Sequence, residues 1–225
     1  SLLLRVAARA PRETLVGLFP RIAEAIDRRR PGLNDIVAAI IARAPNAVPD
    51  PIGTLVGFAE GGALKVALSA AKALYHLVTC GFGTDAHKIV SLAAAQVPGV
   101  QQHASLTMLL LFEAGELGEE TIKRAASAAA APKADLQARI NFLELLRRWC
   151  RKHRRAPSEI VTALSAMLSA VSVAGDYKIG HITLLKAVAE FADEADLELI
   201  AEMAFSVMVG LDLDRISIAE HEASD

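Results

Sequence analysis

The sequence predicts an all-α fold. Apolar residues recur every three or four positions along most of the 225-residue chain, Pro and Gly separate these stretches, and no segment alternates with the two-residue period of a strand. Ala occurs 43 times and Leu 29 times, whereas aromatic residues make up only 4% of the chain, a composition that suits close packing of helices. We therefore expect about ten or eleven short antiparallel helices joined by short turns.

Turn and cap residues set the predicted helix ends in the N-terminal half. Asp50-Pro51 combines an N-cap with Pro at the first helical position, and Gly81 is placed to end a helix. Pro20 lacks the N–H that a helix interior needs, so we expect it to divide the first helix. Thr84 can begin a helix that Pro98-Gly99 ends. The predicted helices cover residues 12–27, 33–41, 51–61, 64–80, 84–97 and 100–113.

The same pattern continues in the C-terminal half. The longest helix is expected from Ala134 to Arg155, because Pro157 follows it. We expect residues 175–180 to form a turn, since Gly stands at both ends of this segment. The other predicted helices cover residues 119–131, 158–174, 182–191 and 193–209.

The predicted helices form one domain, residues 1–211, because no linker rich in Gly, Ser or charge interrupts them. Residues 212–225 form a polar tail that we expect to fray. Helix starts near residues 33, 64, 100 and 134 recur at about one helix-pair length, which favours an irregular α-solenoid of the HEAT or armadillo kind. A globular multi-helix bundle is the alternative.

Composition also excludes several classes of protein. The chain has 24 Lys and Arg against 26 Asp and Glu, a net charge of −2, which argues against a protein that coats nucleic acid. No apolar run is long enough to span a membrane. Two cysteines, Cys80 and Cys150, do not make a disulfide framework, so we expect two reduced, mostly buried thiols in the cytoplasm or another reducing intracellular compartment.

The sharpest local feature is the basic run Arg147–Arg155, which contains the single Trp of the chain. Its cations are a candidate site for an anion or an acidic partner. They also complement the negative end of a helix dipole, which is the simpler interpretation and fits the run Arg28–Arg30 as well. Arg147, Arg151, Arg154 and Arg155 are expected on one helix face. The candidate binding residues are Arg147, Arg148, Arg151, Lys152, Arg154 and Arg155.

No sequence motif indicates catalysis, a cofactor or a metal. Cys150 and His153 have a spacing that places both on one helix face, and His76 precedes Cys80 by one turn, but zinc usually requires four ligands as two such pairs meeting in space. Gly-rich phosphate loops and nucleophile motifs are absent from the sequence. We therefore expect no catalytic residues, no cofactor and no metal site.

These observations favour a helical scaffold or adaptor domain that mediates protein–protein interaction and belongs to a longer chain. The alternative is an α-helical enzyme or small-ligand binder whose apolar pocket lies near Met167 and Met203. A second alternative is nucleic-acid or anion binding through the basic end of the helix at 147–155. The sequence leaves the oligomeric state open.

Overall fold

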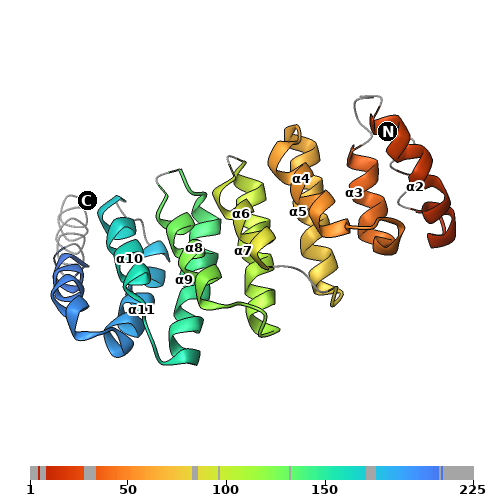
Figure 1. Cartoon of the computed structure of the whole chain (residues 1–225). Helices are drawn as coiled ribbons and strands as arrows, with labels where there is room; N and C mark the ends of the chain where they lie inside the picture. Colours follow the sequence, from red (N-terminus) through yellow and green to blue (C-terminus); the bar gives the residue numbers. More distant parts are fainter. Residues whose placement is uncertain are drawn as a thin grey trace, which may run out of the picture. The chain divides into compact units, whose positions relative to one another are not determined.

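The computed structural model describes Arg5, residues 9–27, 34–82, 86–95, 97–131, 133–170 and 176–207, and Val209. These residues are helical apart from short connections (Figure 1), which confirms the all-α fold class. Within the same residues, β pairing is limited to an isolated bridge between Ala156 and Ala192. The predicted cap Thr84, the basic run Arg28–Arg30 and the tail 212–225 lie outside the described residues.

The main helices are α2 (Arg12–Asp27), α3 (Asn34–Arg43), α4 (Pro51–Gly61), α5 (Leu64–Thr79), α6 (Ala86–Ser91), α7 (Pro98–Glu113), α8 (Glu119–Ala130), α9 (Leu136–His153), α10 (Ser158–Ala170) and α11 (Asp176–Phe191). Residues 197–207 form a further helix. Short 3-10 turns are η1 (Pro45–Ala47), η2 (Leu92–Ala94) and η3 (Glu194–Asp196). The chain divides into two compact units: the first is Ser1–Thr121 with Lys133–Asn141, and the second is Ile122–Pro132 with Phe142–Asp225.

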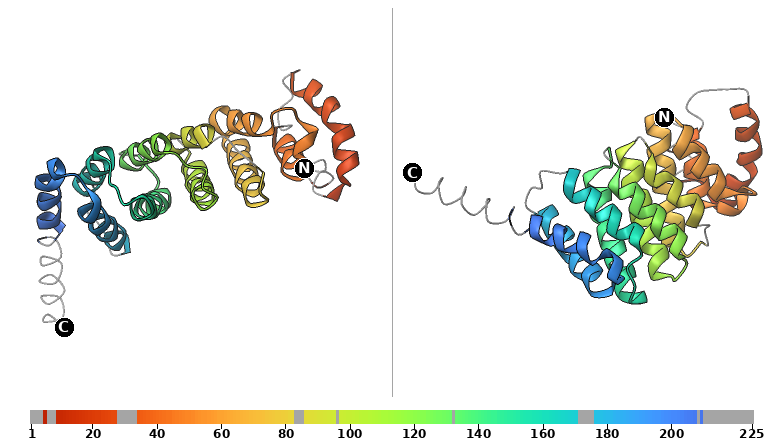
Figure 2. Two further views of the ribbon diagram at one scale, coloured as in Figure 1. Left: turned by 60° about the horizontal axis from the view of Figure 1, so that its bottom comes forward. Right: turned by 60° about the vertical axis from the view of Figure 1, so that its left-hand side comes forward.

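In the first unit, helices pack both with their neighbour and with the helix after next. α4 packs against α5 and α6 against α7, while α3 packs against α5 and α5 against α7 (Figure 2). Stacked helix pairs have this contact pattern. The single domain and the solenoid stay predictions.

Apolar side chains between these helices form the core of the first unit. Leu15 of α2 packs with Ile36, Ile40 and Ala44, a cluster that joins α2 to α3. Further along, the fully buried side chains include Leu55, Leu74, Ile89, Leu92, Met108 and Leu111. Burying one such side chain stabilises the fold by about 1.5–3 kcal/mol, so the apolar stripes of the sequence are the main source of stability here.

Buried polar contacts connect α7 to the start of α9 within the first unit. The Asn141 side-chain amide donates to Ser105 Oγ at 2.9 Å, and the backbone N–H of Asp135 donates to Gln101 Oε1 at 2.7 Å. Asp135 in turn accepts a hydrogen bond from the backbone N–H of Ala138 at 3.0 Å. A side chain in this position caps a helix, which explains why α9 begins at Leu136.

Two predicted helix ends are confirmed. Asp50 caps α4, where its Oδ1 accepts from the backbone N–H of Gly53 at 2.8 Å and Pro51 opens the helix. This hydrogen bond, followed by the contact with Lys88, lowers the pKa of Asp50. Gly81 follows α5 with φ +78°, a left-handed conformation that Gly adopts without strain.

Three predicted breaks between helices are wrong. α2 continues through Pro20: the proline loses the hydrogen bond to the carbonyl of Val16 and its ring crowds that carbonyl, but the rest of the helix remains bonded. Pro98 begins α7 instead of ending the preceding helix, since Pro is favourable in the first turn. α11 begins at Asp176 and includes Gly180, an interior Gly that costs only about 1 kcal/mol relative to Ala.

Candidate functional site at the end of helix α9

The predicted basic run occupies the last turns of α9 and the residues that follow it. The helix ends at His153, two residues before the predicted end, and Arg154 has φ +51°. The backbone N–H of Arg155 donates to the carbonyl of Cys150 at 3.3 Å. A left-handed residue followed by this bond is the Schellman ending of a helix, with Arg in the place where Gly is common. Arg154 and Arg155 therefore do not continue the face of Arg147 and Arg151.

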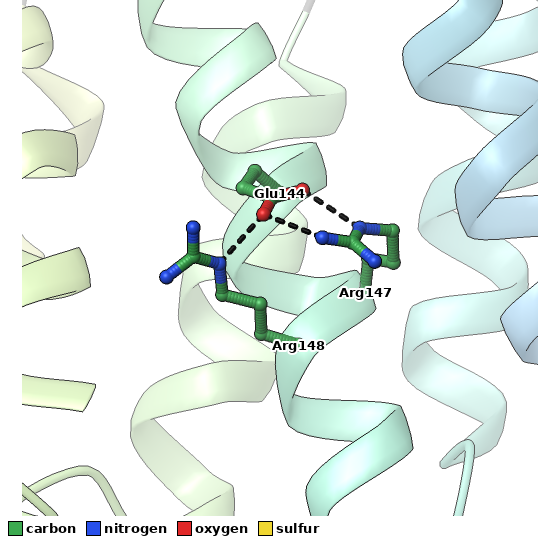
Figure 3. A network of polar contacts seen from close by, with 3 residues as sticks. All are labelled: Glu144, Arg147 and Arg148. Carbon is green, nitrogen blue, oxygen red and sulfur yellow. Dashed lines mark hydrogen bonds and ion pairs between the residues drawn. The ribbon is translucent and has the colours of Figure 1, made fainter. Parts of the chain in front are cut away.

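The first two cations of the run are paired with one acid on the same helix. The carboxylate of Glu144 accepts hydrogen bonds from Arg147 Nε at 2.7 Å and Nη2 at 2.6 Å, and from Arg148 Nε at 2.6 Å (Figure 3). The Arg147 hydrogen bonds are the main cause that lowers the pKa of Glu144. The same bonds raise the pKa of Arg147. One carboxylate thus engages both Arg147 and Arg148 and offsets one of their two charges.

The remaining four predicted site residues stand at the exposed end of the helix. Arg151, Lys152, Arg154 and Arg155 are all exposed. The Arg154 guanidinium lies 6.0 Å from the centre of the Phe191 ring, at the end of α11. The backbone N–H of Ala156 donates to the carbonyl of Phe191 at 3.1 Å and fixes this approach. We call these four residues the basic helix end.

The opposite side of the last turns of α9 is apolar. Trp149 is buried and stacks on His153, with ring centres 4.6 Å apart and an angle of 24° between the planes. Cys150 is also buried, as predicted, and burial raises the pKa of its thiol to about 12. A buried thiol with this pKa stays protonated at neutral pH and should react slowly.

A groove between α8 and α10 lies beside the basic helix end. It has a volume of about 600 Å³. Its walls are small or polar side chains: Ser127, Ala130, Ala131, Ser158, Glu159, Thr162, Ala163 and Ala166. Glu159 forms an ion pair with Lys123 at 2.7 Å, and this hydrogen bond is the main cause that lowers the Glu159 pKa, with a smaller contribution from Arg155.

The sequence does not predict this groove. A signal was present in α10, where Ser158, Thr162 and Ala166 recur every fourth residue and leave one helix face small. The opposite wall comes from α8, and only the packing of the two helices makes a groove from two such faces. The missing information was how α8 and α10 pack against each other.

Two other sequence expectations concern cysteine and metal. The prediction for Cys80 is wrong: its thiol is exposed, because Cys80 follows the last turn of α5 and is not part of its buried stripe. Its Sγ lies 3.7 Å from Nε2 of His76. Over the described ranges, no group of three or more His, Cys, Asp or Glu side chains is arranged to hold a metal ion.

The fold and this surface define an all-α protein with an exposed basic helix end beside an open groove. In the part of the chain that the structure describes, no helix has both the length and the apolar character needed to cross a membrane. No protein-family model, curated protein or solved structure matches the chain.

Proposed function

We propose that the chain is a helical scaffold or adaptor domain that binds an acidic segment of another protein. The observation that carries the proposal is the cluster of exposed cations where α9 ends. Arg151, Lys152, Arg154 and Arg155 are exposed there together, next to Arg147 and Arg148, which hydrogen-bond to Glu144. A local cluster of this kind attracts acidic partners even though the net charge of the chain is −2.

The groove between α8 and α10 supplies the second part of the proposed surface. Small side chains along its walls allow the backbone of a bound segment to approach closely, and Ser127, Ser158 and Thr162 offer hydroxyl groups for hydrogen bonds. Ser158 and Glu159 of the groove wall follow Arg155 by three and four residues, so the groove and the basic helix end are neighbours. An acidic segment can therefore contact both.

A protein segment fits this surface better than nucleic acid. Binding to a duplex requires cations spread along many phosphates, and four residues at one helix end cover only a short stretch of backbone. Single strands are held by rows of exposed aromatic rings, whereas beside the basic helix end Trp149 is buried and Phe191 lies against Arg154. These considerations support the acidic peptide as the partner.

The small-ligand alternative has weaker support. Met167 is fully buried as part of the core of the second unit. Met203 lines a hollow of about 170 Å³ with Leu168, Leu199 and Glu202. Ligand pockets usually have volumes of about 300–1,000 Å³, so this hollow is too small for most ligands.

We also propose that the domain is an irregular solenoid within a longer intracellular protein. The contact pattern of α3, α5 and α7 supports an irregular solenoid, the architecture that scaffold domains of longer proteins often use. The free and exposed Cys80 suits a reducing intracellular compartment, where such a thiol persists. Alkylation of the protein in the source cell, followed by mass spectrometry, tests the second point: a disulfide on Cys80 would contradict it.

A binding experiment tests the proposed function. The probe is a short fluorescein-labelled peptide of Glu and Ser, with a Lys and Ser peptide as its counterpart. We expect the wild type to bind the acidic peptide, and the variant Arg151→Gln/Arg155→Gln to bind it at least about fivefold more weakly and with less dependence on salt. Lys65→Gln/Lys72→Gln is the matched control, because it removes the same charge from two exposed residues of α5. Equal affinity of the two double variants would overturn the proposal.

A further inference from the structure

The helix at 197–207 exposes a stripe of apolar side chains. Leu197 is 49% exposed, Phe205 is 70% exposed and Val209 is 41% exposed, and Ala201 between them is also exposed. These residues are spaced by four, so they lie along one side of the helix. The stripe extends over about 18 Å, or roughly three helical turns. We call it the apolar stripe.

The opposite side of the same helix is already packed. Ile200 and Met203 are buried in the second unit, at 6% and 4% exposure. Single exposed apolar residues are common on protein surfaces. Phe205, however, is the most exposed large apolar side chain among the described residues, and its neighbours along the stripe are apolar as well. Residues four apart on one helix face are the pattern by which two helices recognise each other.

Acidic residues border the apolar stripe. Residues 193–209 contain Asp193, Glu194, Asp196, Glu198 and Glu202, and no Lys, Arg or His. Glu198 and Glu202 are exposed and each directly follows a stripe residue, so both line the same edge of it. The surface is therefore an apolar stripe in a negative field, and it repels an acidic partner.

We propose that the apolar stripe docks a basic amphipathic helix of another protein. Such a helix has apolar residues every three or four positions, which cover Phe205 and its neighbours, and Lys or Arg on its flank, which face Glu198 and Glu202. A second copy of this chain is not the occupant, because the same face on two copies brings Glu against Glu. The surface differs from the basic helix end in location and in the charge of its partner.

A pair of designed peptides tests this proposal. The probe is a fluorescein-labelled helical peptide with Leu on one face and Lys on its flanks, and its control has Glu in place of every Lys. We expect the full chain to bind the Leu/Lys peptide and not the Leu/Glu peptide. Phe205→Gln should weaken binding at least about tenfold, since a central aromatic anchor is removed. Circular dichroism should be unchanged, because Phe205 is exposed.

Charge variants supply the second measurement. Glu198→Gln/Glu202→Gln should weaken binding of the Leu/Lys peptide by about threefold and reduce its dependence on salt. Glu13→Gln/Glu116→Gln, an equal charge change at two exposed positions of the first unit, should bind as the wild type does. Arg151→Gln/Arg155→Gln should also bind normally, which separates this surface from the proposed function.

Two results would overturn the proposal. One is equal affinity of the wild type and Phe205→Gln for the Leu/Lys peptide, which would place binding elsewhere on the molecule. The other is a wild type that sediments as a dimer while Phe205→Gln sediments as a monomer, which would make the stripe a contact between two copies of this chain.

Discussion

Glu144 and Arg147 form a bidentate ion pair within α9, in which Arg147 Nε and Nη2 donate to the two carboxylate oxygens at 2.7 and 2.6 Å. Parallel hydrogen bonds between a guanidinium and a carboxylate are the strongest form of this contact. Arg148 donates to the same carboxylate, so one acid holds two cations. The first two cations of the basic run are thereby engaged by an acid of their own helix, although Arg148 stays exposed.

The first prediction concerns the stability that Glu144 provides. Glu144→Gln should lower the free energy of unfolding at neutral pH by about 0.5–1 kcal/mol, a modest value because Arg148 is 43% exposed and solvent screens the pair. The folded pKa of Glu144 lies below its ordinary value of 4.5. The stabilisation is therefore present above pH 4.5 and is lost as the pH falls through the lower folded pKa.

Urea unfolding of both proteins at a series of pH values checks this prediction. The difference between wild type and Glu144→Gln should be constant at pH values above the ordinary carboxyl pKa of 4.5 and should shrink as the pH falls below it. A difference that persisted in acid would show that Gln disturbs packing and that the ion pair is not the cause.

The second prediction concerns the backbone of Arg154. Its φ of +51° is unfavourable for any residue with a Cβ, by about 1 kcal/mol, and Gly avoids this strain. Arg154→Gly should therefore be more stable than Arg154→Ala by about 1 kcal/mol, although both lose the contact with Phe191. Thermal unfolding of the two variants measures the difference. Ala equal to Gly would mean that residue 154 does not hold this conformation in solution.

The third prediction concerns the two thiols. Cys80 is exposed and should react with a thiol reagent in the native protein. Cys150 is buried with its pKa raised to about 12, so it should react only after denaturation. One equivalent of fast-reacting thiol is expected in the wild type and none in Cys80→Ser. Fast reaction of Cys80→Ser would show that the end of α9 opens readily.

Sequence periodicity was sufficient to predict the fold class and most helices, because a helix that buries one face has apolar residues every three or four positions. Two wrong predictions also have local causes. Pro20 and Gly180 are residue types that often end helices, yet a single residue of this kind does not end a helix that packs along its length. The pairing of Glu144 with Arg147 and Arg148 has the spacing of three and four that a helix requires, and it could have been predicted.

The rest of the candidate site depends on contacts between helices. The position of Phe191 under Arg154 and the groove between α8 and α10 each combine residues far apart in the chain. The spacing of residues along one sequence does not indicate which distant residues come into contact. The exposure of Cys80 depended on where α5 ends, and helix ends are the least certain part of any pattern.

The last prediction compares two double variants that remove the same charge from one helix. Arg147→Gln/Arg148→Gln removes the three hydrogen bonds that Glu144 accepts, so this variant should lose about 1 kcal/mol of stability and keep its affinity for an acidic peptide. Arg151→Gln/Arg155→Gln should have the opposite profile. Its stability should change by less than about 0.5 kcal/mol, because exposed cations near a helix end contribute little, while peptide binding weakens.

Urea unfolding and fluorescence anisotropy measure the two quantities on the same samples, and a labelled DNA duplex and single strand serve as further probes. We expect neither oligonucleotide to bind at physiological salt. If Arg151 and Arg155 only complemented the helix dipole, their loss would lower stability and leave peptide binding intact. If the wild type retained an oligonucleotide tightly and the variant Arg151→Gln/Arg155→Gln did not, the basic helix end would be a nucleic-acid site, because only phosphate binding gives that combination with a steep salt dependence.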